Sequence, residues 1–109
     1  MISIEDFEKL DIRTGTIIKA KVFPEARKPA FKLEIDFGEL GIRRSSAQIT
    51  EVYSIHDLTG KQVIAVVNLS PRRIGPFVSE CLVLGVMGAP EGVVLLTPDH
   101  KVKNGLKIA

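Results

Sequence analysis

Hydrophobic and polar positions alternate with a two-residue period over much of this chain. Residues 31–37, FKLEIDF, alternate strictly, which puts four apolar side chains on one face and three charged ones on the other. Residues 12–22, IRTGTIIKAKV, form a longer strand candidate, in which every second residue from Ile12 to Val22 would share one face. Gly15 in its middle indicates a bend or bulge, which a small closed barrel needs.

Shorter apolar runs predict the rest of the sheet. A third strand begins at Ile42 and extends to Ser46 or a little beyond, and residues 62–67, QVIAVV, predict a strand that is buried on both faces. Two further strands, 81–87 and 92–96, surround the turn GAPEG.

Glycines, prolines and polar residues mark the connections between these strands. We expect loops at 23–30 and around Pro71, Gly75 and Pro76, a turn at 38–41, and an irregular or weakly helical segment at 49–58. Asn104-Gly105 is a strong hairpin-turn signal near the C-terminus.

The N-terminal residues predict a short helix. Ser3 followed by Asp6 resembles a capping box, and Ile4, Phe7 and Leu10 fall three apart to give one apolar stripe. This stripe could cover an end of the barrel, or part of it could contact a second subunit. The sequence leaves both open.

Many short strands and few helices favour a closed all-β barrel. With 109 residues and 45% hydrophobic composition, the chain is long enough to bury a core, and it has no repeat, low-complexity tract or linker. We therefore expect residues 1–109 to form a single domain.

Charge is unevenly distributed along the chain. The net charge is +2, but residues 1–11 carry −3, which leaves +5 for the other 98 residues. An acidic start followed by a mildly basic body indicates a surface that faces anions.

The composition also favours the cytoplasm. Cys81 is the single cysteine and lies in an apolar run, so no disulfide can form within the chain, and a buried, inert thiol fits a reducing compartment. No signal peptide is visible, and no apolar stretch approaches the roughly 20 residues that a membrane-spanning helix needs.

Signals for catalysis are poor. His56 and His100 are far apart, and neither has a partner at metal-ligand spacing. Gly-rich phosphate loops, a nucleophile elbow and paired carboxylates are missing. We therefore expect a binding protein without a metal or cofactor, and not an enzyme.

Two arginine pairs are the best binding signals. Arg43-Arg44 opens RRSSAQIT and Arg72-Arg73 lies in NLSPRRI, each beside a predicted strand. Planar, permanently charged guanidinium groups suit phosphate or carboxylate partners. We expect all four to converge on one flank of the barrel, where they would line a groove for a polyanion or an extended polypeptide.

Polar and apolar neighbours extend this candidate groove. Ser46 and Asn68 could hydrogen bond to phosphate, base or peptide groups, although Asn68 could equally form a turn. Ile74 and Phe77 would either fold back onto the core or contact an apolar ligand. Ser79 and Glu80 precede the next strand and could line the same groove.

Aromatic residues are too few for one class of ligand. The chain has no Trp, one Tyr and five Phe. Proteins that bind single strands without sequence preference stack successive bases on aromatic side chains. The composition therefore leaves two options, recognition of a folded RNA through its phosphates or capture of a peptide.

The motifs resemble the tRNA-binding-domain family over nearly the whole chain. The matching segments are DFEKLDIRTGTI (6–17), KLEIDFG (32–38), RSSAQIT (44–50), KQVIAVVNLSPRRI (61–74) and SECLVLG (79–85). The resemblance implies a five-stranded OB-fold barrel with a short N-terminal helix, and terminal extensions that build a homodimer. It also implies RNA contacts in tRNA-binding members, through residues that match Asn68, Arg72, Ser79 and Glu80.

RSSAQIT and NLSPRRI resemble most the CsaA-type chaperones, a bacterial branch of this family. That branch implies ATP-independent binding of unfolded or export-precursor polypeptides. The alternative is a tRNA-binding module that recognises folded RNA through phosphate contacts. After Ser79-Glu80 the tRNA-binding members usually carry Gly-Met, whereas this chain has Cys81-Leu82. A bulkier residue in place of glycine limits how closely a nucleic-acid backbone can approach, which favours the chaperone branch.

Overall fold

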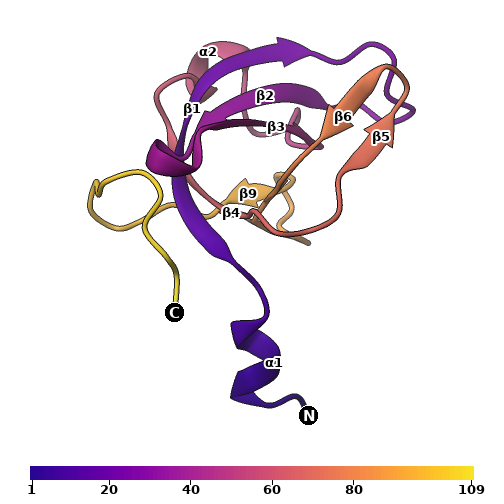
Figure 1. Ribbon diagram of the computed structural model, residues 1–109. Coiled ribbons are helices and arrows are strands. Elements are labelled where there is room, and N and C mark those ends of the chain that lie inside the picture. The colour runs from indigo at the N-terminus through magenta and orange to yellow at the C-terminus, as the bar shows by residue number, and fades with distance from the viewer.

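The computed structural model describes residues 1–109 and confirms an all-β fold. Five antiparallel strands in the order β3-β2-β1-β4-β7 curl into a nearly closed barrel of the OB type (Figure 1). Their bounds are β1 Ile12–Val22, β2 Phe31–Asp36, β3 Ile42–Ala47, β4 Gln62–Val66 and β7 Leu82–Val83.

The barrel interior is filled by the apolar faces that the alternation predicts. Phe31, Leu33, Ile35 and Phe37 are 8%, 1%, 0% and 0% exposed, which confirms the inward face of β2. Strand β4 is buried on both faces, as expected. Burying each large apolar side chain contributes about 1.5–3 kcal/mol, so these strands dominate the stability of the barrel.

The single inward face predicted for β1 is wrong. The register with β2 shifts between Ile17 and Lys19, so a bulge divides the strand into two halves. Ile17 is fully buried, whereas Ile18 is 41% exposed. A Cβ on Gly15 would lie 2.7 Å from Ile35, so this glycine allows close packing inside the barrel. The bulge lies after Gly15, between Ile17 and Lys19.

A second apolar layer covers the outside of β1 and β4. Ile12, Ile64 and Val66 are buried there beneath Phe7, Leu84 and Ile108. The C-terminal segment helps to cover them by running beside β1, with hydrogen bonds from Gly105 N to Thr14 O and from Ile108 N to Ile12 O. Asn104-Gly105 does form a turn, but the predicted hairpin is wrong because Lys107 pairs with Arg13 in β1.

Two pairs of short strands complete the sheet structure. Strands β5 (Arg72–Ile74) and β6 (Phe77–Ser79) form a hairpin where the sequence predicted a loop, with Gly75 at a φ of 58° in the two-residue turn. The predicted strand 81–87 is divided into β7 and β8 (Gly85–Val86). It divides because β7 pairs with β4, whereas β8 pairs with β9 (Val94–Leu95).

Two short helical segments lie in the connections between strands, and a third precedes β1. The turn at 38–41 contains the 3₁₀ helix η1 (Gly38–Leu40), and α2 (Ile55–Leu58) lies within the segment predicted to be weakly helical and buries Leu58. Helix α1 (Ile4–Glu8) begins at the expected capping box of Ser3 and Asp6. None of these helices has the length and apolar character needed to cross a membrane.

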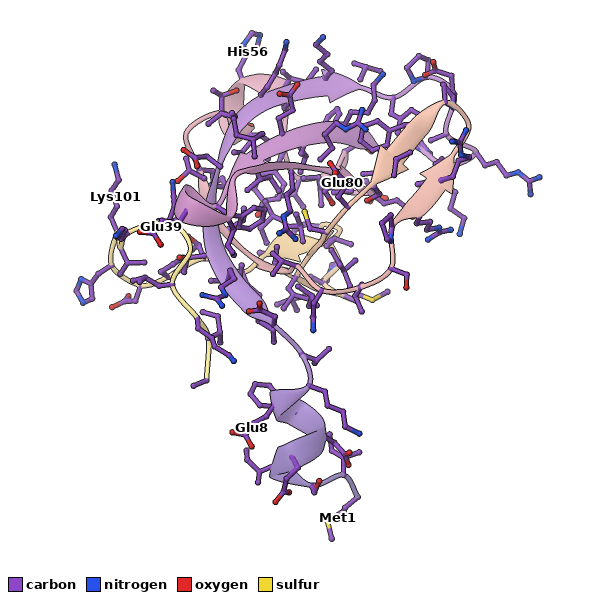
Figure 2. All side chains as sticks on the ribbon, in the orientation of Figure 1. Met1, Glu8, Glu39, His56, Glu80 and Lys101 are labelled. Carbon is purple, nitrogen blue, oxygen red and sulfur yellow. The ribbon has the colours of Figure 1, made fainter.

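Helix α1 projects away from the barrel, with Met1 and Glu8 well clear of it (Figures 1 and 2). It buries no residue of its own, and Phe7 alone packs against the outer apolar layer. Coverage of a barrel end by this helix, the first of the two alternatives, is therefore wrong.

Candidate functional site

Three surface hollows surround the hairpin β5–β6, which stands beside the ends of β2 and β3 (Figure 1). The strand hollow lies on the outer face of β1, β2 and β3 and has a volume of about 190 Å³. Its lining residues are Lys19, Lys21, Lys32, Leu33, Glu34, Arg44 and Phe77.

The loop hollow lies between β5 and the loop that joins β1 to β2, and its volume is about 570 Å³. Charged residues dominate its walls, with Arg27, Lys28, Arg72 and Arg73 against the single carboxylate of Glu25. Its other lining residues are Ala26, Ala30, Ser46, Gln48, Ile74 and Gly75.

The seam hollow, of about 270 Å³, is more apolar. Leu69 and Leu82 on its walls are 44% and 48% exposed. Its other lining residues are Ser46, Ser70, Arg72, Ile74, Ser79, Glu80 and Cys81. It shares Ser46, Arg72 and Ile74 with the loop hollow, so the two hollows adjoin, and we refer to them together as the trough.

Arg43 does not belong to this surface, so the expected convergence of four guanidinium groups is wrong. Adjacent residues of a strand point to opposite faces. Arg43 pairs with the inward-facing Ile35, and its guanidinium donates a hydrogen bond of 2.7 Å to the carbonyl of Val67. Arg43 therefore ties β3 to the end of β4, while Arg44 faces outward into the strand hollow.

Arg44 is held in place by two contacts. Its guanidinium lies 5.3 Å from the centre of the Phe77 ring, and its Nε lies 3.6 Å from a carboxylate oxygen of Glu80. The same carboxylate accepts a hydrogen bond from the Arg44 backbone N–H. Glu80 lies beside β6 (Figure 2) and follows its last residue directly. Its contacts with Arg44 therefore connect the end of the hairpin to β3.

Phe77 is a structural residue more than an exposed apolar contact. It is 8% exposed and packs against Phe23, with ring centres 5.2 Å apart, and against Ala30. Ile74, its pairing partner across the hairpin, is only partly buried and lines the trough. Of the two alternatives, Phe77 therefore folds back onto the apolar interior. Ile74 still has exposed surface that a ligand could contact.

The serines near β3 join the hairpin to the barrel. Ser79 Oγ accepts a hydrogen bond from the Ser46 backbone N–H and donates one to the carbonyl of Cys81. The fully buried Ser45 also donates to that carbonyl, over 2.9 Å. The side chain of Ser46 lines both hollows of the trough.

Cys81 is buried, as predicted, and unsuited to nucleophilic chemistry. Burial raises the pKa of its thiol to about 11, so the reactive thiolate is scarce near neutral pH. The structure brings no three His, Cys, Asp or Glu side chains together in a way that could hold a metal ion.

Asn68 connects the N-terminal segment to the barrel. Its side-chain oxygen accepts a hydrogen bond of 2.8 Å from Asp11 N, and its amide nitrogen donates one of 2.8 Å to Lys9 O. Val67 N also donates to Asp11 O. Both ends of the Asn68 side chain are therefore engaged where α1 leads into β1, next to the loop that carries Leu69 and Arg72.

Replacing Asn68 with Ala should loosen the N-terminal segment. Two hydrogen bonds are lost, worth about 1 kcal/mol each, so amide exchange at Asp11 should quicken by roughly tenfold or more. Hydrogen–deuterium exchange measures this directly. Ser70→Ala, in the same loop and without such bonds, is the control, and equal exchange in both variants would show that Asn68 has no such role.

Several basic residues of the hollows were missed by the sequence analysis. Lys19, Lys21 and Lys32 line the strand hollow, and Arg27 and Lys28 line the loop hollow. The alternation of residues 31–37 did place Lys32 on the outer face. The positions of Lys19 and Lys21 depend on the bulge in β1, which fixes their register opposite Glu34 and Lys32.

The fold and the motifs agree with the results of comparison with known proteins. The sequence profile described as "Putative tRNA binding domain" matches residues 12–107, so this chain belongs to the tRNA-binding-domain family. It is 35% identical over 105 residues to a methionine–tRNA ligase from Methanococcoides burtonii, which covers 96% of this chain and 15% of that enzyme. The chain thus spans about 15% of the length of such relatives.

Two solved structures are similar over the whole chain. The chaperone CsaA from Bacillus anthracis is 53% identical, with a TM-score of 0.95 and coverage of 100% of this chain and 99% of that one. The CsaA chaperone protein from Picrophilus torridus is 51% identical, with a TM-score of 0.95 and full coverage of both chains.

Proposed function

We propose that this protein is an ATP-independent chaperone of the CsaA type, which acts in the cytoplasm as a homodimer. It holds unfolded or export-precursor polypeptides in extended form. Holding requires no bond to be made or broken, so the proposal includes no nucleotide, metal or catalytic residue. The similarity to two CsaA chaperones over their full length supports it.

The observation that carries this proposal is the mixed character of the trough. Its seam end offers the exposed side chains of Leu69 and Leu82, and its loop end offers Arg72 and Arg73. An unfolded polypeptide presents apolar side chains beside backbone carbonyls and charges. Apolar contact contributes most of the affinity, while arginine donates hydrogen bonds to carbonyl or carboxylate oxygens.

The alternative function is that of a tRNA-binding module, which would use the same cations on phosphates. The free cations of the hollows and the family itself favour it. Cys81-Leu82, where the tRNA-binding members usually carry Gly-Met, weighs against it, because a bulkier residue in place of glycine limits how closely a nucleic-acid backbone can approach. We therefore rank polypeptide first.

The N-terminal helix supports a homodimer. Ile4 in this helix is 66% exposed, and Ile2 and Leu10, which lie just before and just after it, are 77% and 37% exposed. A five-residue helix with no buried residue is marginal alone in water. A second subunit would cover this stripe, and two troughs on one particle would raise the avidity for a long client without new contacts.

Binding of a labelled unfolded precursor fragment tests the proposal. We expect binding by the native protein, suppression of aggregation of the whole precursor, and about tenfold or greater weakening in Leu69→Ser/Leu82→Ser, which removes apolar contact without changing charge. Ile42→Ser, at an apolar side chain that is 58% exposed outside the hollows, is the matched control.

A titration with bulk tRNA at low and at physiological salt distinguishes the tRNA-binding alternative from the chaperone proposal. Affinity for tRNA that falls by several powers of the salt concentration, together with no binding of the precursor, would replace the chaperone proposal with RNA binding.

A further inference from the structure

The positive charge of this protein is concentrated around the hairpin β5–β6. The strand and loop hollows contain eight Lys and Arg and two Glu, a net of +6. The whole chain carries +2, so the remaining residues carry −4. The small net charge therefore conceals one strongly cationic wall on an otherwise acidic molecule.

These cations are almost all free of carboxylate partners. Arg44, at 3.6 Å from Glu80, is the one member of the eight with a carboxylate within 4.0 Å. Instead, Lys32 and Arg44 lie 5.3 Å from the ring centres of Phe23 and Phe77. These cation–π contacts hold the two charged groups against aromatic rings without neutralising their charge.

The register of the strands brings the charges close together. Lys19 pairs with Glu34, which pairs with Arg44, and Lys21 pairs with Lys32 in the next row. Neighbouring strands lie about 4.8 Å apart, so each row spans about 10 Å, comparable to the Debye length at physiological salt. Lys21 and Lys32 face each other directly and repel, whereas Glu34 lies between Lys19 and Arg44 and offsets part of their repulsion. A bound anion relieves the repulsion that remains.

Both cationic hollows border the same apolar element. Phe77 of β6 lines the strand hollow, and its pairing partner Ile74 of β5 lines the loop hollow. A ligand that spans both hollows thus meets the cations of each together with one apolar side chain of the hairpin, and Ile74 also borders the seam hollow with its two leucines. The matching chemistry is an apolar residue with negative charge on its flanks.

We propose that this wall selects client segments in which apolar side chains are flanked by aspartate or glutamate. This selectivity depends on the chaperone function proposed above. The same charges reject segments rich in lysine or arginine, since discrimination against a ligand can come from repulsion as well as from attraction. The basic start of an export signal would therefore stay free, while acidic stretches of the precursor are held.

Three labelled peptides of equal length test the selectivity, each with the same leucine-containing centre and flanks of Asp, Ser or Lys. For the native full-length chain at physiological salt, the order of affinity should be Asp, Ser, Lys, with at least a tenfold difference between the ends of the series. The difference should shrink as salt is added, because screening weakens each of the several charge contacts.

Two variants with the same change of net charge locate the effect. Lys19→Glu/Lys32→Glu should lower the preference for the Asp peptide at least fivefold. Lys101→Glu/Lys103→Glu changes exposed lysines outside the hollows and should keep the native order. Equal effects of the two variants would overturn the assignment to this wall.

The remaining outcomes separate this proposal from the one on which it depends. Equal binding of all three peptides by the native protein would overturn the charge selectivity and leave the chaperone function intact. Binding of none of them, or of the precursor fragment, would overturn both. Release of the Asp peptide by bulk tRNA at equal molar charge, with tRNA the tighter ligand at physiological salt, would assign the wall to RNA and overturn the selectivity for acidic clients.

Discussion

Replacing Ile4 with Asp is expected to convert the proposed homodimer into a monomer without unfolding the barrel. Ile4 is 66% exposed on a helix that projects from the barrel and buries nothing itself (Figure 2). If a second subunit covers this side chain, a symmetric dimer buries it twice. The loss of about 1.5–3 kcal/mol per copy corresponds to a dissociation constant raised by about 10²- to 10⁴-fold.

Sedimentation at several protein concentrations measures this effect. Ile42→Asp is the matched control, because Ile42 is 58% exposed on β3, away from α1 and the outer apolar layer. We expect Ile42→Asp to keep the native assembly state and both variants to keep a native melting temperature. A native protein that sediments as a monomer at all concentrations would contradict the dimer.

Replacing Gly105 with Ala is expected to be the most destabilising single change among the glycines of the turns. Gly105 has a φ of 85°, and an added Cβ would collide with the carbonyl oxygen of Phe37. Its N–H also donates to Thr14 O, which holds the C-terminal segment on β1. The backbone conformation costs about 1–2 kcal/mol and the collision about 1–3 kcal/mol, so we expect a total of about 3 kcal/mol.

Chemical denaturation of matched variants separates the two causes. Gly88 has a φ of 86° with no atom within 4 Å of the Cβ position, so Gly88→Ala should show the conformational cost alone, about 1–2 kcal/mol. Equal loss of unfolding free energy in the two variants would mean that the C-terminal segment moves aside easily and contributes little to the fold.

The barrel was predictable because its strands are specified by local patterns. The alternation at 31–37 and the apolar run at 62–67 each determine which faces are buried, and both predictions are confirmed. The face of β1 was mispredicted because a bulge depends on pairing with another strand. The sequence predicts a loop in place of the hairpin β5–β6, because Gly75 and Pro76 mark a turn and three-residue strands are too short to show a period.

The candidate site was only partly predictable for similar reasons. Adjacent residues of a strand alternate, so Arg43 and Arg44 could have been assigned to opposite faces from sequence alone. The roles of Asn68 and Phe77 could not be predicted from sequence, because each depends on a neighbour that is distant in sequence. Asn68 bonds to Lys9, and Phe77 packs against Phe23. The cationic wall arises in the same way, from residues of the four strands β1, β2, β3 and β5 and of the one loop that joins β1 to β2.

Mapping of backbone amide chemical shifts during titration with an unfolded precursor fragment tests the central claim, that the trough beside the hairpin β5–β6 holds an extended polypeptide. We predict the largest changes at Ser46, at 69–74 and at 79–82. Little change is expected at His56, which lies at the top of the barrel in Figure 2, apart from Glu80 and the hairpin. Changes gathered around α2, with none beside the hairpin, would contradict the account.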